Sequence, residues 1–225
     1  MAEKDYPAQW IADAIKEAVE NNKRNLRYIL KILERWAAQG IESIFKECGA
    51  ILEGHFLLTS GLHSPVYWEK FCVIENPKYA QQLCAMIAKR FTDVAIAVVA
   101  GPTTGGVILA FEVARQMGLR AAFAEKEGDN RIIKRGHSIS PGDNVLIVDD
   151  IFTTGKSVRE VIKAVEERGG EVAAIAVLVD RSVEKHDFGV PFYSCLRTEP
   201  PLYTPAKCPQ CAAGIPLARH GKKLD

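Results

Sequence analysis

The chain has 225 residues, the length of one large domain or of one domain with an appendage. Hydrophobic residues make up 48% of it and charged residues 25%, as in ordinary globular proteins, and the net charge of +1 provides no broad basic surface for nucleic acid. No apolar run is long enough to span a membrane, and the N-terminus lacks the apolar core of a signal peptide. We therefore expect a cytoplasmic protein whose six cysteines are mostly reduced.

The first forty residues differ in pattern from the rest. Apolar side chains recur at helical spacing over 10–19 and again over 26–36, which predicts two amphipathic helices. Such a pair is too small to bury a large core by itself. We therefore divide the chain into an N-terminal helical extension, 1–40, and a main domain, 41–225.

The main domain alternates predicted helices and strands. This alternation implies an α/β fold with a mostly parallel sheet and helices on both of its faces. The predicted elements are, in order, a helix over 41–48, strands over 55–59 and 66–71, a helix over 77–90, a strand over 94–100, a helix over 107–117, strands over 121–124 and 145–148, a helix over 158–165 and a strand over 172–179.

The segment VLIVDDIFTTGKSV (145–158) carries the strongest chemical signal. A strand that reads as buried on both faces ends in Asp149 and Asp150, and a loop of hydroxyls, one glycine and one lysine leads into a helix. Ligands of open α/β sheets bind at this edge, and a helix N-terminus suits a phosphate. Carboxylates beside a phosphate suggest ribose hydroxyls or Mg²⁺ as partners. The alternative is an ordinary strand–helix turn with a solvated acidic pair.

This segment closely resembles the phosphoribosyl pyrophosphate (PRPP) motif of type I phosphoribosyltransferases. The resemblance implies a type I phosphoribosyltransferase fold in which Asp149 and Asp150 hold the ribose 2- and 3-hydroxyls. It also implies that the loop holds the 5-phosphate through Thr153, Thr154, Gly155, Lys156 and Ser157.

A second glycine-rich turn, GPTTGG (101–106), follows another predicted strand. Its glycines allow the backbone to approach an anion closely. In the family that the first motif resembles, the corresponding turn cups the pyrophosphate, which assigns Thr103, Thr104 and Gly105 to PRPP. By itself the turn equally well serves tight packing.

The segment GHFLLTSGLHSPVYW (54–68) resembles the hood of orotate phosphoribosyltransferases. Tyr67 and Trp68 offer flat faces to a planar base, and the resemblance also assigns Thr153 to orotate. Since neighbours on a strand point to opposite faces, at least one of the two aromatics is alternatively a core residue.

The family has an arginine where VDRS (179–182) places Arg181, near the orotate carboxylate. A guanidinium can hold a carboxylate through two parallel hydrogen bonds, which lysine cannot do. The alternative is that Arg181 pairs with a neighbouring aspartate.

The polar segment EKEGDNRIIKRGH (125–137) is similar to a loop that, in this family, closes over the site of the neighbouring subunit of a dimer. The resemblance implies that its cations meet the pyrophosphate. Lys126 matches a family lysine and is assigned as catalytic together with Asp149 and Asp150. Arg131 and Lys134 are assigned to PRPP, and Arg135 and His137 are further cations of the loop. For each cation the alternative is a solvated surface charge.

The sequence departs from the family at three positions. Many members have lysines at the places of Thr59 and Gly105 and an arginine at the place of Glu125. The loop cations must then neutralise more of the charge on pyrophosphate.

The pair CPQC (208–211) has the spacing of half a zinc site, which would need two further ligands, and the sequence leaves open whether these cysteines bind metal. His220 is the histidine nearest in sequence, and a symmetric dimer that joins two such pairs is another source. The remaining cysteines stand singly and are expected to be ordinary thiols.

The N-terminal segment WIADAIKEAVENNKRNLRYILKILERWAAQGI resembles part of the DnaD-like C-terminal domain of bacterial replication-initiation proteins. A natural fusion, an engineered join and an unrelated helical hairpin all remain open as its origin. Residues 1–40 contain seven Lys/Arg and six Asp/Glu, which gives little basis for DNA binding.

The resemblance implies an orotate phosphoribosyltransferase of pyrimidine biosynthesis. Such an enzyme converts PRPP and orotate to orotidine 5′-monophosphate and pyrophosphate as a homodimer. Mg²⁺ would be bound through PRPP, with Asp149 and Asp150 as further ligands. The alternatives are a purine phosphoribosyltransferase and a non-catalytic PRPP-sensing regulator with a DNA-binding N-terminus.

Overall fold

The computed structural model describes residues 8–58, 60–134, 139–183, 186–199 and 201–218. The chain divides into two compact units, Met1–Ile44 and Phe45–Asp225. Within the described ranges, no helix combines the length and the apolar character that crossing a bilayer requires.

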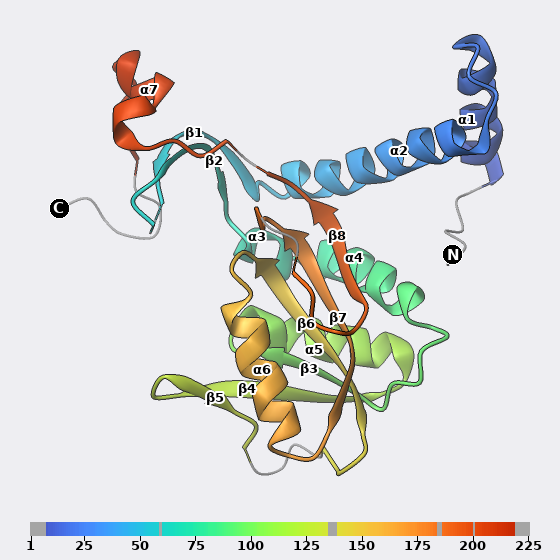
Figure 1. Ribbon diagram of the computed structural model, residues 1–225, viewed down its shortest axis with the longest axis vertical. Helices are drawn as coiled ribbons and strands as arrows, with labels where there is room; N and C mark the ends of the chain where they lie inside the picture. Colours follow the sequence, from blue (N-terminus) through green and yellow to red (C-terminus); the bar gives the residue numbers. More distant parts are fainter. Residues whose placement is uncertain (1–7, 59, 135–138, 184–185, 200, 219–225) are drawn as a thin grey trace. The chain divides into compact units, whose positions relative to one another are not determined.

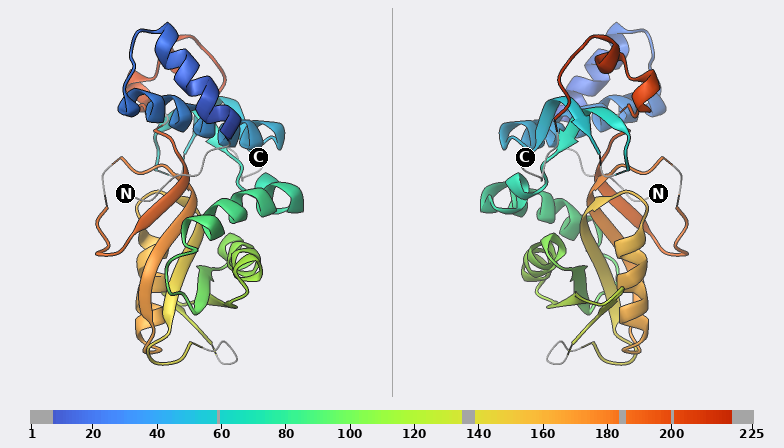
Figure 2. Two further views of the ribbon diagram at one scale, coloured as in Figure 1. Left: turned by 90° about the vertical axis from the view of Figure 1, so that its right-hand side faces the viewer. Right: turned by 90° about the vertical axis from the view of Figure 1, so that its left-hand side faces the viewer.

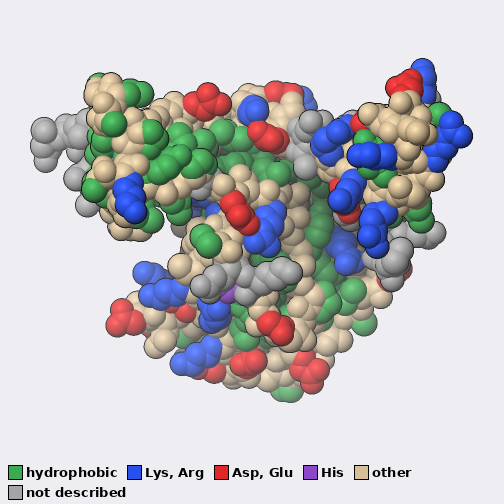
Figure 3. Space-filling view, turned by 45° about the horizontal axis from the view of Figure 1, so that its top comes forward, with side chains coloured by type: hydrophobic (Ala, Val, Ile, Leu, Met, Phe, Trp, Pro, Cys, Tyr) green, Lys and Arg blue, Asp and Glu red, His purple; other side chains and the backbone are tan. Residues whose placement is uncertain are grey.

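The N-terminal unit is built from two helices, α1 (Ala8–Glu20) and α2 (Leu26–Glu47). A small apolar cluster joins them, and Lys and Arg side chains gather over their surface (Figure 3). The predicted extension is therefore helical, but the separate helix expected over 41–48 is wrong, because α2 runs through Gly40 without a break. A glycine inside a helix costs only about 1 kcal/mol, which is too little to end it. The cluster consists of Ala14, Ala18, Ile32 and Leu33.

A six-stranded sheet forms the centre of the second unit (Figure 1). All neighbouring strands are parallel except β5, which runs antiparallel to β4. This confirms the predicted α/β fold. The strand order is β5-β4-β3-β6-β7-β8, with β3 (Val98–Pro102), β4 (Arg120–Glu127), β5 (Asn130–Ile132), β6 (Asn144–Phe152), β7 (Glu171–Asp180) and β8 (Phe192–Arg197).

Helices cover both faces of this sheet (Figure 2). α4 (Pro77–Arg90) and α5 (Gly105–Met117) lie on one face, and α6 (Lys156–Glu166) lies on the other. The start of α4 follows from its sequence: Pro77 occupies the first turn, and the side chain of Asn76 accepts a hydrogen bond from the Lys78 N–H. The apolar stripe of α6 packs on alternate residues of β3, β6 and β7 within one buried cluster.

The segment that was expected to be a loop over 125–137 is partly a hairpin. Glu125–Glu127 extend β4 and pair with β5, and Lys126 lies opposite Arg131. Arg135 and His137 lie outside the described residues. β8 was not expected from the sequence.

A smaller sheet precedes α4 in the chain. β1 (Ile51–Leu57) and β2 (His63–Trp68) form an antiparallel hairpin, followed by the short helix α3 (Phe71–Ile74). The C-terminal tail, 201–218, contains η1 (Pro205–Lys207) and the short helix α7 (Pro209–Ala212). Its backbone bridges both strands of the hairpin, so residues from the two ends of this unit share one small layer.

Candidate functional site

The twin aspartates lie at the C-terminal end of β6, as predicted, and both are buried. Asp149 accepts hydrogen bonds from the Ser157 hydroxyl at 2.6 Å and from the Asp150 N–H at 2.8 Å. Burial, followed by the charge of Asp150, raises the pKa of Asp149 to about 6. Two buried carboxylates side by side are stabilised by hydroxyl donors or a cation, which is what a ribose and its metal would bring.

Lys70 supplies one cation that the sequence analysis missed. Its ammonium nitrogen lies 3.0 Å from Oδ2 of Asp150 and 3.1 Å from Oδ1. Lys70 follows β2 directly, so the smaller sheet delivers it to the end of β6. The signal that could have found it is the lysine two residues after Trp68, within the predicted strand over 66–71.

The loop between β6 and α6 has the geometry of an anion site. Gly155 has a φ of 74° and forms the N-cap of α6, so the first N–H groups of that helix are open to a ligand. A Cβ there would lie 2.8 Å from Nη1 of Arg159 and 2.9 Å from the ring of Phe152.

A pocket of about 260 Å³ adjoins this loop. It brings together the predicted 5-phosphate residues and two of the predicted cations. Its lining residues are Lys126, Arg131, Ile151, Thr153, Thr154, Gly155, Lys156, Ser157 and Glu160.

The turn after β3 approaches the carboxylates closely. A Cβ on Gly105 would lie 2.1 Å from Oδ2 of Asp150, and one on Gly101 would lie 2.2 Å from the carbonyl oxygen of Gly106. A side chain at Gly105 would have to displace the Asp150 carboxylate and the end of the Ile74 side chain. The absence of a lysine there is therefore consistent with the position of Asp150 in this chain. Thr59, the other departure, lies outside the described residues.

The cations of the β4–β5 hairpin differ in their contacts. Arg131 donates to Oγ1 of Thr103 at 3.0 Å and forms an ion pair with Glu160 at 3.2 Å, so it already touches the predicted pyrophosphate turn. Lys134 instead pairs with Glu125 at 2.7 Å. Lys126 is exposed and lines the pocket.

Arg181 lies just beyond the end of β7, and its backbone N–H donates to the carbonyl of Phe152 at 2.8 Å. Its Nε is buried and has no hydrogen-bond partner among the described residues. Burial lowers its pKa, and the nearby Tyr67 opposes that shift. Within the described ranges, no ion pair joins Arg181 to a neighbouring aspartate. Asp180 instead accepts from Ser182 at 2.7 Å and faces Arg197 at 3.6 Å.

The two hood aromatics occupy different environments. Trp68 is 7% exposed and packs edge-on against Phe45, with ring centroids 5.3 Å apart. Tyr67 is half-buried, lies 5.7 Å from the ring of Phe56 and interacts with Arg181. The packing favours a core role for Trp68 and leaves Tyr67 as the better placed contact for a base.

Fold and site together define a phosphoribosyltransferase, and a family model described as a phosphoribosyl transferase domain matches residues 73–199. An orotate phosphoribosyltransferase of Pelotomaculum thermopropionicum is 47% identical over 81% of this chain and 96% of its own length. One from Caldanaerobacter subterraneus subsp. tengcongensis is 46% identical over 80% and 95%. The chain belongs to the orotate phosphoribosyltransferase family.

A solved structure supports the same assignment of fold. The crystal structure of orotate phosphoribosyltransferase from Aeropyrum pernix is 26% identical and superposes with a TM-score of 0.60, covering 70% of this chain and 93% of the other. The N-terminal helices match a second family model, described as replication initiation and membrane attachment, over residues 1–45. This match is consistent with the resemblance to DnaD-like replication proteins that the sequence suggested.

Proposed function

We propose that this chain transfers the 5-phosphoribosyl group of PRPP to orotate, giving orotidine 5′-monophosphate and pyrophosphate in pyrimidine biosynthesis. The observation that carries the choice of base is the buried Nε of Arg181, which lies near Tyr67 and has no hydrogen-bond partner in the part of the chain that the structure describes. Arg181 directly follows β7, which pairs with β6, the strand that carries the twin aspartates near its C-terminal end. Orotate carries a carboxylate that could accept from this guanidinium, whereas adenine and hypoxanthine have none.

The assignments for the donor follow the geometry of β6 and its loop. Asp149 and Asp150 accept from the ribose hydroxyls, and the α6 N-terminus with its hydroxyl-rich loop holds the 5-phosphate. The β3–α5 turn and Arg131 hold the pyrophosphate, and Arg131 already bonds to Thr103 of this turn. Lys134 is the weaker candidate for PRPP, since it forms an ion pair with Glu125.

Mg²⁺ fits this donor set, because carboxylate oxygens are its preferred protein ligands. Asp149 and Asp150 would hold it together with oxygens of PRPP, and it would neutralise charge on the donor when bound. The raised pKa of Asp149 is consistent with a carboxylate that needs a cation or hydroxyl donors beside it.

The chemistry requires positioning more than covalent catalysis. The bond between ribose C1 and the pyrophosphate oxygen breaks, positive charge grows on the ribose, and negative charge grows on the leaving group. Lys126 and Arg131 neutralise the leaving group, and Arg181 with Tyr67 orients the ring nitrogen of orotate. Closure of the 125–137 segment would exclude water, which otherwise hydrolyses the donor.

We further propose that the chain acts as a homodimer, in which the 125–137 segment completes the site of the neighbouring subunit. The exposure of Lys126 supports this, because its ammonium is available to a second chain. Residues 1–40 are proposed to be an added helical segment that takes no part in this chemistry.

A turnover assay with three bases tests the function. Pyrophosphate release from Mg²⁺·PRPP is expected with orotate and not with adenine or hypoxanthine. Release with adenine or hypoxanthine would show that the chain is a purine phosphoribosyltransferase. A different result would support the second alternative. If the chain bound PRPP and shifted promoter DNA in a gel but turned over no base, it would be a non-catalytic PRPP-sensing regulator.

A further inference from the structure

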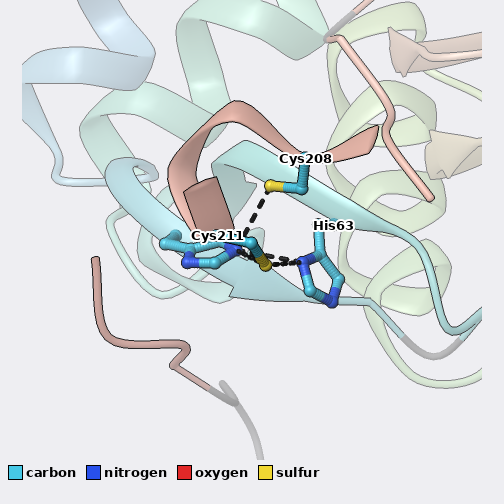
Figure 4. Close-up of side chains that lie close together, drawn as sticks. His63, Cys208 and Cys211 are labelled. Carbon is cyan, nitrogen blue, oxygen red and sulfur yellow. Dashed lines mark hydrogen bonds between the residues drawn. The ribbon is translucent and has the colours of Figure 1, made fainter. Parts of the chain in front are cut away.

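Four potential metal ligands converge where the C-terminal tail crosses the β1–β2 hairpin. They are His55 of β1, His63 of β2, Cys208 and Cys211, and their ligand atoms all lie within 4.8 Å of one another. Figure 4 shows the side chains of His63, Cys208 and Cys211 pointing toward a common centre. The proposed chemistry of PRPP and orotate uses none of them.

The spacing of these atoms is that of a tetrahedral site. Sγ of Cys208 lies 3.4 Å from Nε2 of His55, and Sγ of Cys211 lies 3.6 Å from that atom and 3.3 Å from Nδ1 of His63. The two imidazole nitrogens are 3.0 Å apart. A zinc tetrahedron with two N and two S ligands has N···S edges of about 3.5 Å and an N···N edge of about 3.3 Å.

The orientation of His55 is fixed from outside the cluster. Its Nδ1 lies 2.8 Å from the carbonyl oxygen of Ile215, which can accept only if that nitrogen carries the proton. In the neutral ring, Nε2 then presents its lone pair to the two thiols and to His63. A histidine that donates through one nitrogen to a backbone carbonyl while the other faces the ligand cluster has the second-shell arrangement of metal-bound histidines.

Burial and charge favour a dication at this point. His55, His63 and Cys208 are each at most 4% exposed. Two thiolates would neutralise Zn²⁺, so the bound site would carry no net charge into its buried surroundings. Two thiolates with two imidazoles are the ligand set of a structural zinc site, with all four positions supplied by protein.

We propose that these four residues bind Zn²⁺ and thereby join the C-terminal tail to the β1–β2 hairpin, the segment that resembles the hood of the family. Backbone pairs on both sides of the cluster already join the two segments. Tyr203 exchanges hydrogen bonds with His63 at 2.8 and 2.9 Å, and the Ala218 N–H donates to His55 at 2.7 Å. A two-stranded hairpin alone is marginally stable, so the metal would stabilise the layer from which Tyr67 and Lys70 project.

From the sequence, the conceivable sources of two further ligands are His220 and a second chain, and metal binding is left open. His220 lies outside the described residues, and the structure brings His55 and His63 instead. In the register of the hairpin, Leu57 is opposite His63, so His55 is its diagonal neighbour on the same face. The signal that could have found the site is a pair of histidines eight residues apart, one on the predicted strand over 55–59 and one in the segment that joins it to the predicted strand over 66–71.

The test measures metal in the full-length chain. We expect protein refolded with Zn²⁺ and then gel-filtered to retain zinc in stoichiometric amount. Co²⁺ in its place should give the intense visible bands of a tetrahedral site and a thiolate-to-metal charge-transfer band. Cys208→Ser and Cys211→Ser each remove one of the two thiolates, so each should lose about half of the charge-transfer intensity and weaken retention at least about tenfold. Cys72→Ser, which removes a thiol outside the cluster, should bind as the wild type does.

Three results would overturn the proposal, and two of them are measured on the wild-type chain. One is a wild-type chain, reduced and folded by circular dichroism, that retains neither Zn²⁺ nor Co²⁺. Another is metal retained equally by Cys211→Ser, whose thiol is exposed and whose replacement is mild. A stable Cys208–Cys211 disulfide that persists under reducing conditions and blocks Co²⁺ would count against the site in the same way. PRPP turnover is not a readout here, so failure of the proposed function would leave this test unaffected.

Discussion

The ammonium group of Lys70 contacts both carboxylate oxygens of Asp150, at 3.0 and 3.1 Å, although the two residues lie 80 positions apart in the chain. The side chain of Asp150 is 6% exposed and that of Lys70 is 39% exposed. A buried carboxylate therefore depends on a cation that comes from the end of the hood hairpin. This ion pair joins the end of the β1–β2 hairpin, which is proposed to hold the base, to the C-terminal end of β6, which is proposed to hold the ribose.

Replacing Lys70 by Met should weaken the binding of PRPP. Without its cation, the buried Asp150 carboxylate loses its ion-pair partner and is held less firmly in position to accept from a ribose hydroxyl. We expect a loss of about 1–2 kcal/mol, or about 5–30-fold in the dissociation constant, measured by calorimetry with Mg²⁺·PRPP. Lys78→Met, in the first turn of α4, is the control and should bind normally. Equal affinity in Lys70→Met and wild type would show that this ion pair has no part in donor binding.

Gly105 should tolerate no side chain. Since a Cβ would lie 2.1 Å from Oδ2 of Asp150, Gly105→Ala must displace the carboxylate or the turn. We expect at least a tenfold loss of kcat/KM and a lower free energy of unfolding by about 1–3 kcal/mol, from urea denaturation and steady-state kinetics. In Gly40→Ala, nothing lies within 4 Å of the new Cβ, and the helix gains about 0.5–1 kcal/mol. If Gly105→Ala behaved like Gly40→Ala, the tight approach of turn and carboxylate would be wrong.

The motifs predicted from sequence were those whose parts lie close together along the chain. The strand, the acidic pair and the phosphate loop occupy consecutive positions, so a single pattern predicts all three, and the structure brings them together. The position of Arg181 could also be predicted locally, because it comes two residues after the predicted strand over 172–179, which in the structure is β7 and pairs with β6.

The features that the sequence did not predict depend on distant or weak signals. Lys70 meets Asp150 only through the tertiary fold, and the cluster of His55, His63 and the two tail cysteines joins segments about 150 residues apart. The pairing of Glu125–Glu127 with β5 lies in a polar sequence without strand periodicity. At Gly40 the local preference for a break was overridden by the helix on either side.

Arg181→Lys should raise the KM for orotate while leaving that for PRPP nearly unchanged. Lysine keeps the charge but cannot present two parallel donors, and the buried Nε is lost. The loss of a charge-assisted hydrogen bond is about 1.5–3 kcal/mol, or about 10–150-fold in the KM for orotate. Arg115→Lys, at an exposed pair with Glu112, is the matched control. A rise in the KM for PRPP alone would show that Arg181 contacts PRPP and not orotate.

Asp149→Asn should stabilise the folded chain at pH 8 while abolishing most activity. The pKa of Asp149 rises from 3.8 to about 6 on folding, so the folded state binds its proton more tightly. The stability that this proton provides is present below pH 4 and is lost as the pH rises through 6. The ionised carboxylate then costs up to about 3 kcal/mol, which asparagine avoids while still bonding to Ser157 and the Asp150 N–H.

Urea denaturation at pH 8, 6 and 4.5 measures this difference between variant and wild type. The gain in Asp149→Asn should shrink as the pH falls. Asp143→Asn is a control of opposite sign, because the Ser140 N–H and then Arg120 hold the pKa of Asp143 below its usual range. Removing that carboxylate should destabilise the chain at pH 8, with the loss diminishing in acid. A pH-independent loss of stability in Asp149→Asn would contradict the unfavourable burial of its charge.

Lys126→Ala should lower kcat far more than the affinity for PRPP. The exposed ammonium has little to contact in the ground state, whereas negative charge grows on pyrophosphate as the bond to ribose breaks. We expect kcat to fall at least about 100-fold with an almost unchanged dissociation constant for PRPP. Lys163→Ala, an exposed lysine on α6 that pairs with Glu167, should retain full turnover.

A mixing experiment tests whether Lys126 acts across a dimer. Lys126→Ala and Asp149→Asn are each expected to be nearly inactive, since one lacks the cation and the other lacks the ribose carboxylate. If the 125–137 segment completes the neighbouring site, a mixed dimer contains one site with both groups intact. Unfolding and refolding the two variants together should then restore activity, and refolding each alone should not. Equal inactivity of the mixture, with mixed dimers verified by mass spectrometry, would place Lys126 in the site of its own subunit.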